Sequence, residues 1–329
     1  MKHRCAIFAD VGTTNARVWL VRDGQVLARG QAQVGVRDTA RDGSNRKLRE
    51  TLKRLIDAAV AEGGEHPSVF VAAGMIGSAL GLAEVPHVPA PAGLTELAAG
   101  TRRFAFLDIT PLPVLIVPGV RTGTLAGAPS AVCDADIMRG EETLCAGLMA
   151  VVSAPATVLN LGSHWKAIAI DAAGRITGSI TTLSGEMIHA VQSSTILSSA
   201  VPPGRPGELD ASWLRDGMRE QRRSSLARAL FCVRLLEQSG KGTAEQRMAF
   251  LVGAFIAADI AALFTPRVGG SADGGDVLLV GSGGLTAAWK AALSPVGIDA
   301  LIVSEHQAET ALLAGLGKVL DACADHQLV

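Results

Sequence analysis

The chain has 329 residues, 48% of them hydrophobic, and a formal net charge of −1 at pH 7. The length and composition suit a large core divided over two domains. Since the basic residues are scattered and balanced by acids, we expect neither nucleic acid nor a membrane surface as a partner. No signal-peptide pattern is visible, and apolar runs such as residues 312–320 are too short to cross a bilayer. Five cysteines without C-x-x-C spacing predict reduced thiols and a cytoplasmic location.

The first part of the chain alternates short apolar strands with helices. Residues 5–11 and 16–22 predict two strands on either side of a Gly-Thr-Thr turn, and Asp23-Gly24 is typical of a hairpin turn into a third. Leucines at helical spacing predict an amphipathic helix over residues 46–62. We also expect a strand that ends in a glycine-flanked loop over residues 68–78 and a short strand over residues 115–120. A helix that opens with two acids is expected over residues 140–151.

A second copy of the opening pattern begins 150 positions later. Asp10 falls on Asn160, Gly12 on Gly162 and Thr13 on Ser163, and each copy reads as a strand, a Gly-Ser/Thr turn and a second strand. One interpretation is chance, because such hairpins are common in a chain rich in glycine and alanine. The other is an internal duplication, which predicts two turns facing one another across a cleft.

The residues at these turns suit a phosphate ligand. Asp10 ends an apolar strand, and burying an unpaired carboxylate costs several kcal/mol, so it requires a cation or an opening. Small residues let the backbone approach an anion, threonine hydroxyls donate to phosphate oxygens, and a carboxylate can hold the Mg²⁺ of a nucleotide. A third turn lies between a predicted strand and helix over residues 276–293, where helix N–H groups could meet phosphates. It lacks P-loop spacing.

Several blocks together resemble the 2-dehydro-3-deoxygalactonokinases, which are sugar-acid kinases. The resemblance covers nearly the whole chain and rests on DVGTTNARVWL, AGMIGSALGLAEVPHVPAPAG, IMRGEETLCAG, LGSHWK, SGEMIHAVQSSTIL and VGSGGLTAAW, which begin at residues 10, 73, 137, 161, 184 and 280. It implies an α/β, two-domain fold of the actin, Hsp70 and hexokinase type (ribonuclease H-like), with a duplicated mixed sheet and a central ATP cleft. The expected parts are an N-terminal domain (1–150), a C-terminal domain (151–305) and a final helix packing back on the first (306–329).

The resemblance implies phosphorylation of 2-dehydro-3-deoxy-D-galactonate at its 6-hydroxyl by MgATP. Asp10 would hold Mg²⁺, and the sugar acid is the expected small-molecule partner. The cofactor-binding candidates lie in three turns and one strand: Gly12, Thr13 and Thr14; Gly162, Ser163, His164 and Lys166; and Gly281, Ser282, Gly283 and Gly284. The substrate-binding candidates are Gly74, Met75, Ile76, Gly77, Ser78 and Glu186.

Two assignments stay open at this point. The second turn offers no aspartate as a base, so Glu141 or Glu142 is expected to accept the hydroxyl proton. Two adjacent helical residues point about 100° apart, so only one can face the substrate. Arg139 is a candidate for the substrate carboxylate, or alternatively a salt-bridge partner of Glu142.

The chain also departs from the family pattern. Leu82 and His87 stand where the family tends to have tryptophan and tyrosine, and the second turn carries Leu161 and Trp165 at altered positions. We expect these changes to bear on sugar-acid specificity more than on phosphoryl transfer. Rival functions on the same fold are a nucleotide or polyphosphate hydrolase and a non-catalytic ATP-binding regulator. A homodimer is left open.

Overall fold

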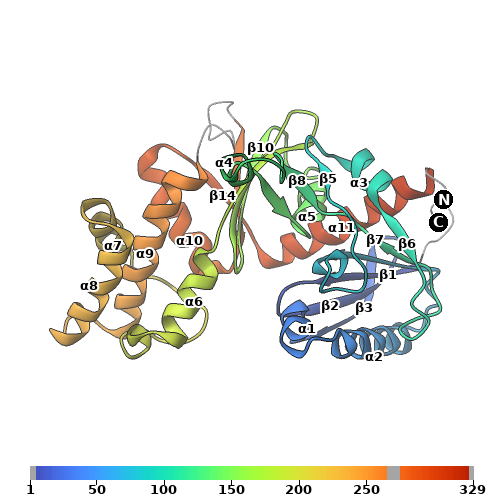
Figure 1. The fold of residues 1–329 in the computed structure, drawn as a ribbon, viewed down its shortest axis with the longest axis horizontal. Coiled ribbons are helices and arrows are strands. Elements are labelled where there is room, and N and C mark those ends of the chain that lie inside the picture. The colour runs from blue at the N-terminus through green and yellow to red at the C-terminus, as the bar shows by residue number, and fades with distance from the viewer. Residues whose placement is uncertain (1–4, 265–274, 326–329) are drawn as a thin grey trace. The chain divides into compact units, whose positions relative to one another are not determined.

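The computed structural model describes residues 5–264 and 275–325, and the chain divides into two units (Figure 1). One unit contains the chain up to Val152, Gly174–Ile176 and the chain from Glu309 onward. The other contains Ser153–Ala173 and Thr177–Ala308. We call them unit 1 and unit 2 and describe each by itself.

Unit 1 is built on a mixed sheet in the order β3-β2-β1-β4-β7-β6. Its strands are β1 (Cys5–Val11), β2 (Ala16–Arg22), β3 (Gln25–Ala32), β4 (Val69–Gly74), β7 (Val114–Ile116) and β6 (Arg102–Phe104). The three leading strands pair antiparallel as predicted, whereas β1, β4 and β7 run parallel. Asp23 and Gly24 both have positive φ, at 53° and 81°, which gives the tight turn expected between β2 and β3.

Helices and a small second sheet complete unit 1. Helix α2 (Arg46–Gly63) confirms the predicted amphipathic helix, since its leucine face is buried. The other elements are α1 (Val36–Asp42), η1 (Met75–Gly77), α3 (Leu94–Gly100), α4 (Pro129–Cys133), α5 (Glu141–Leu148), α11 (Glu305–Asp325) and a sheet of β5 (Val88–Pro89), β8 (Val120–Thr122) and β9 (Asp136–Met138). The single strand expected over residues 115–120 is wrong, because β7 ends before Pro118 and β8 begins after Gly119.

Unit 2 repeats the strand order of unit 1. Its sheet runs β12-β11-β10-β13-β14, made of β10 (Ala156–Leu161), β11 (Trp165–Ile170), β12 (Ile176–Thr182), β13 (Asp276–Gly281) and β14 (Ala300–Val303). A hairpin is again followed by two parallel partners, β13 and β14. The offset of 150 is interrupted after the first strand, because Leu161 pairs with Trp165 whereas Val11 pairs with Ala16. The second turn is therefore one residue shorter.

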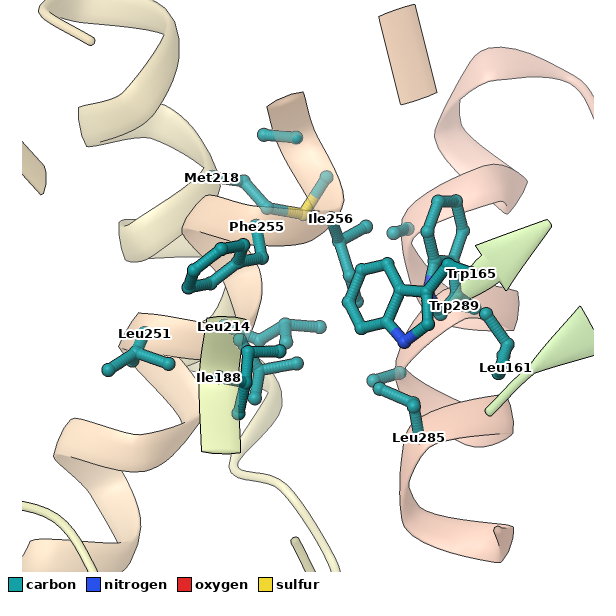
Figure 2. Packing of buried hydrophobic residues seen from close by; sticks show 14 of the residues in the cluster. Leu161, Trp165, Ile188, Leu214, Met218, Leu251, Phe255, Ile256, Leu285 and Trp289 are labelled. Carbon is teal, nitrogen blue, oxygen red and sulfur yellow. The ribbon is translucent and has the colours of Figure 1, made fainter. Parts of the chain in front are cut away.

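Helices provide most of the core of unit 2. They are α6 (Ser184–Ser194), η2 (Ile196–Ser199), α7 (Ala211–Arg223), α8 (Leu226–Gln238), α9 (Ala244–Leu263), α10 (Gly283–Leu293) and η4 (Ser294–Val296). Figure 2 shows Trp165 and Trp289 among buried aliphatic side chains, and their rings meet edge to face with centroids 5.4 Å apart. Leu161 and Trp165 flank the second turn, so the core fixes both of its ends.

Helix α9 is longer and more continuously apolar than the runs considered from the sequence. Among the described residues it is the one helix long and apolar enough to cross a bilayer by length and composition. However, 67% of its apolar window is buried inside the protein, where it packs against α7 and α8. Its hydrophobicity on all sides is that of a core helix.

A pair of glycines in α11 tests how closely α5 and α11 pack. A Cβ at Gly315 would lie 1.9 Å from the Thr143 carbonyl oxygen, whereas the nearest atom to a Cβ at Gly317 is Phe8 Cζ at 4.0 Å. Gly315→Ala should therefore lower the free energy of unfolding by about 2 kcal/mol or more. Gly317→Ala should raise it by about 0.5–1 kcal/mol, because alanine favours a helix. Urea unfolding measures both, and equal effects would contradict this packing.

Candidate active site

The first turn, residues 12–15, presents an open backbone. Its ends are closed by the Gly12 amide, which donates to the Asn15 carbonyl at 2.8 Å, and Thr14 is exposed. A Cβ at Gly12 would meet only the Asn15 carbonyl oxygen, at an ordinary 3.7 Å, and its φ lies outside the left-handed region. Neither packing nor backbone conformation requires glycine there. A ligand that approaches the backbone closely would require it.

The start of α1 holds this turn from behind. The Val36 and Arg37 amides donate to the Gly12 and Thr13 carbonyls at 3.3 and 2.9 Å. Gly35 makes this approach possible, since a Cβ there would lie 2.4 Å from the Thr13 carbonyl oxygen. The Gly12 and Thr13 carbonyls are thus occupied, and the anion-binding donors that this turn can offer are the N–H groups after Gly12 and the threonine hydroxyls.

Asp10 lies where three segments of unit 1 converge. It is next to last in β1, and its Oδ1 faces two backbone positions: it would lie 2.9 Å from a Cβ at Gly74 and 3.7 Å from one at Gly140. Its Oδ2 accepts a hydrogen bond from Arg17 at 2.5 Å, so the carboxylate is paired. The Asp10 side chain is 16% exposed and that of Arg17 is 44% exposed, so the pair is not sealed from solvent.

The glycine-flanked loop after β4 is held by hydrogen bonds within itself. Gly74 has φ 85°, and the Ser78 hydroxyl donates to the Met75 carbonyl at 2.7 Å. Ile76 is fully buried in the core, so only its backbone can face a ligand. Gly77 lies beside Arg139, whose Nη1 would be 3.2 Å from a Cβ at that position.

Arg139 carries an unused donor. Its Nη2 donates to the Val85 carbonyl at 2.6 Å and lies 3.4 Å from His87 Nδ1. Its Nη1 is buried and has no hydrogen-bond partner among the described residues. Within the same residues no ion pair joins Arg139 to Glu142. Burial lowers the pKa of the guanidinium, which still carries its charge at neutral pH.

The two adjacent acids of α5 occupy different surroundings. Glu142 is 1% exposed, and both of its carboxylate oxygens accept from the Gly140 amide at 2.8 Å. Burial raises the pKa of Glu142 to about 7, and the neighbouring Glu141 adds to the rise. Glu141 is partly exposed, and its Oε2 accepts from the Arg139 amide at 3.2 Å. Glu141 is thus the more accessible of the two.

The second turn, residues 162–164 in unit 2, repeats the first. Gly162 and Ser163 are exposed, and a Cβ at Gly162 would meet only the His164 carbonyl oxygen, at 3.8 Å. The Glu186 amide donates to the Ser163 carbonyl at 2.7 Å. Gly185 allows this contact, since a Cβ there would lie 2.3 Å from the Gly162 carbonyl oxygen.

Two further candidates of unit 2 lie beside this turn. The Glu186 carboxylate lies 3.3 Å from His164 Nε2, so this candidate sits with the second turn. Lys166 is 4% exposed, on β11, and is therefore not part of the turn surface in this structure.

The third turn, at the start of α10, is open at one glycine only. A Cβ at Gly283 would meet nothing within 4 Å. At Gly284 it would lie 1.9 Å from the Gly207 carbonyl oxygen, and at Gly281, with φ 159°, 2.8 Å from Leu161 Cβ. Ser282 is the N-cap of α10. Packing therefore explains Gly281 and Gly284, and Gly283 is the one suited to a ligand.

A magnesium ion would be coordinated by Asp10 together with phosphate oxygens of the bound nucleotide. Within residues 5–264 and 275–325 no group of three or more His, Cys, Asp or Glu side chains could hold a metal ion. Mg²⁺ in nucleotide sites is commonly held by one or two carboxylates together with phosphate oxygens and water. Asp10 Oδ1, turned away from Arg17, fits that limited role.

Sequence reasoning missed Gly35 and Gly185, which brace the two turns. They stand 150 positions apart, as Gly12 and Gly162 do, so extending the repeat would have found them. It also missed the contact between His87 and Arg139. Only a fold that returns the chain to β9 could reveal that contact.

Comparisons with known proteins agree over nearly the whole chain. A family profile described as 2-keto-3-deoxy-galactonokinase matches residues 10–319. A protein of Rhizobium meliloti (strain 1021) named "Probable 2-dehydro-3-deoxygalactonokinase" is 30% identical over 317 residues, covering 94% of this chain and 96% of its own. The 2-dehydro-3-deoxygalactonokinase of Escherichia coli (strain K12) is 26% identical, covering 97% and 98%.

Solved structures agree on the fold. The crystal structure of a candidate 2-dehydro-3-deoxygalactonokinase from Sinorhizobium meliloti has a TM-score of 0.74 at 28% identity, covering 97% of this chain and 99% of its own. An activator of 2-hydroxyisocaproyl-CoA dehydratase from Clostridium difficile, solved with bound ADPNP, has a TM-score of 0.52 at 12% identity, covering 99% and 98%. The expected two-part ATPase fold of the actin, Hsp70 and hexokinase type is confirmed.

Glu142 should make stability depend on pH. Its pKa is about 7 in the folded protein against an ordinary 4.5, so its contribution is fully present below pH 4.5 and is lost as pH rises through 7. Glu142→Gln does not titrate there. The unfolding free energy of the wild type minus that of Glu142→Gln should fall by roughly 3 kcal/mol between pH 4 and pH 8. Urea unfolding across this range measures it, and a constant difference would refute the assignment.

Proposed function

The chain belongs to the 2-keto-3-deoxy-galactonokinase family, and from this premise we propose how its residues carry out the reaction of that family. It is an ATP-dependent phosphotransferase with an alcohol acceptor, and its substrate is 2-dehydro-3-deoxygalactonate. The finer proposal is that the γ-phosphoryl group passes to the 6-hydroxyl of the D-sugar acid. A cytoplasmic place in galactonate catabolism is part of the same proposal.

The site assignment rests on three glycines at which a side chain would make no close contact. Gly12, Gly162 and Gly283 have open space beside the Cα atom, although each lies in a turn that other contacts fix. Elsewhere in these turns, glycine is explained by a carbonyl or side chain that would clash. A phosphate that approaches the backbone amides gives the three open positions a reason to be glycine. Each turn would then donate N–H groups to ATP phosphates, with Thr13, Thr14 and Ser163 adding hydroxyls.

The sugar acid is proposed to bind beside the loop of residues 74–78. Its carboxylate needs a cation or oriented N–H groups, and Arg139 offers a buried Nη1 with no partner among the described residues, next to Gly77. Because Nη2 is fixed on the Val85 carbonyl, the guanidinium is already oriented. His87 contacts that same nitrogen, so the departure at this position bears directly on the proposed carboxylate receptor.

We assign the proton acceptor to Glu141. A base must come within hydrogen-bond distance of the substrate hydroxyl, and Glu142 is 1% exposed with its oxygens already on the Gly140 amide. Glu141, at the first position of α5, is partly exposed. Its carboxylate would take the hydroxyl proton as the oxygen attacks the γ-phosphorus. Glu142 would hold the turn at Gly140, close to Asp10.

Asp10 would help to hold Mg²⁺, which neutralises charge on the phosphate oxygens when ATP is bound. The ion pair with Arg17 leaves one carboxylate oxygen for this role, facing Gly74 and Gly140. Arg17 is half exposed and can itself face a phosphate while keeping its hydrogen bond.

An acceptor panel tests the function. With MgATP, ADP release should occur with 2-dehydro-3-deoxy-D-galactonate and should be at least 100-fold weaker with hexoses, because Arg139 requires a carboxylate. Phosphate release without any sugar would indicate the hydrolase instead. ATP binding without turnover on any acceptor would indicate the regulator.

Asp10→Asn belongs in the same assay. It should lower kcat by about 100-fold or more while the protein stays folded, since a neutral amide binds Mg²⁺ poorly. Asp57→Asn, which changes an exposed acid on α2, is the matched control and should retain full activity. Full activity of Asp10→Asn would remove the metal role.

The two acids of α5 can be separated by kinetics. Glu141→Gln should reduce kcat by about 10²–10⁴-fold with little change in either KM, as loss of a general base does. Glu142→Gln should reduce kcat by less than about tenfold, because its amide oxygen can still accept from Gly140. The reverse order would transfer the base to Glu142.

A further inference from the structure

A buried carboxylate in unit 2 has no part in the reaction as described. Asp259 lies in α9, a helix of otherwise mainly apolar residues, and is 6% exposed. Its Oδ2 accepts a hydrogen bond from the Thr182 hydroxyl at 2.6 Å. The Thr182 and Ser184 hydroxyl oxygens lie 3.2 Å apart, so the three side chains form one cluster.

A carboxylate at this position is costly to the fold. Burial raises the pKa of Asp259, which is the expected sign for a carboxyl group removed from water. Replacing a buried charged group with an apolar one is often neutral or stabilising. If α9 needed only to pack, an apolar residue would serve. The carboxylate must therefore be explained by what it holds.

The cluster sits at the junction between β12 and α6. Thr182 is the last residue of β12 and Ser184 the first of α6. Leu183 between them is the N-cap of α6, but it makes no side-chain capping bond. Asp259 reaches this junction from α9 and accepts from Thr182, whose hydroxyl oxygen lies 3.2 Å from that of Ser184. Helix starts are usually fixed by a capping side chain. Here Asp259, from another helix, fixes the chain next to the helix start instead.

The same helix start braces the second turn. Gly185 fits against the Gly162 and Ser163 carbonyls, and the Glu186 amide donates to the Ser163 carbonyl at 2.7 Å. These two residues follow Ser184 directly. Any displacement of the β12–α6 junction would therefore be passed to the turn by rigid backbone contacts.

We propose that Asp259 is a positioning residue for ATP, which fixes the turn at residues 162–164 through Thr182, Ser184 and the start of α6. The inference rests on the proposed function in one respect, namely that this turn binds ATP phosphates. Asp259 itself touches no substrate. The site of the sugar acid, proposed for unit 1, should not depend on it.

The test uses Thr182→Val in the full-length enzyme, because valine keeps the shape of threonine and removes the hydroxyl. Amide hydrogen exchange at Glu186 should become about tenfold faster, and the KM for ATP should rise about tenfold, as expected for loss of a buried hydrogen bond to a charged group. The KM for the sugar acid should stay within about twofold. Ser179→Ala is the matched control: Ser179 lies in the same strand, buried, and its hydroxyl has no hydrogen-bond partner among the described residues.

Substitutions of Asp259 complete the test. Asp259→Ala should reproduce the effect of Thr182→Val, and the double variant should be no worse than either, because both remove the same bond. Asp259→Asn should keep the KM for ATP within about threefold, since its amide oxygen can still accept from Thr182. A merely structural role would lower thermal stability without changing the ratio of the two KM values.

The two ideas fail in different ways. Unchanged exchange at Glu186 in folded Thr182→Val would overturn the positioning role. Faster exchange with an unchanged KM for ATP would support positioning and show instead that this turn does not bind ATP. If Asp259→Ala does not fold, Thr182→Val still decides the question.

Discussion

The contact on which the rest depends is the backbone brace behind each glycine turn. In both units the helix that follows the three-strand segment donates an amide to a carbonyl of the turn, and a glycine at 35 or 185 allows the approach. Carbonyl oxygens repel phosphate, whereas amides and hydroxyls attract it. Engaging the carbonyls from behind therefore leaves each turn with a surface of donors, held in place before any ligand binds.

The two braces are held by different side chains. In unit 1 the Gly35 amide donates to Asp38 Oδ2 at 3.1 Å, and Lys47 and Arg41 pair with the other oxygen of that carboxylate near the surface. In unit 2 the corresponding junction is held from inside by Asp259, a buried acid on a separate helix. The repeated backbone is thus supported by different interactions in the two units.

The candidate chemistry of unit 1 depends on a crowded meeting of three segments. A Cβ at Gly74 would lie 2.5 Å from the Val11 carbonyl oxygen and 2.9 Å from Asp10 Oδ1, whereas Gly140 is favoured by its φ of 104°. The Gly140 amide holds the buried Glu142, and the backbone amide of Arg139 holds Glu141. One short turn therefore orients two acids and a guanidinium at once. Burial raises the pKa of Glu142 to about 7, whereas Glu141 stays partly exposed.

The sequence by itself determined the local structure around the turns. Alternating apolar residues, Gly-Thr-Thr and Asp-Gly fix hairpins by short-range sterics, and their register alone pairs Asp10 with Arg17 across the strands. Motif order was enough to identify the family. Helices α7, α8 and α9 were not predicted, and for α9 the reason is that it is apolar on all sides and lacks a helical stripe. Only the tertiary structure decided which acid of α5 is buried and what Arg139 and Asp259 contact, since those partners lie far away in sequence and their burial depends on packing.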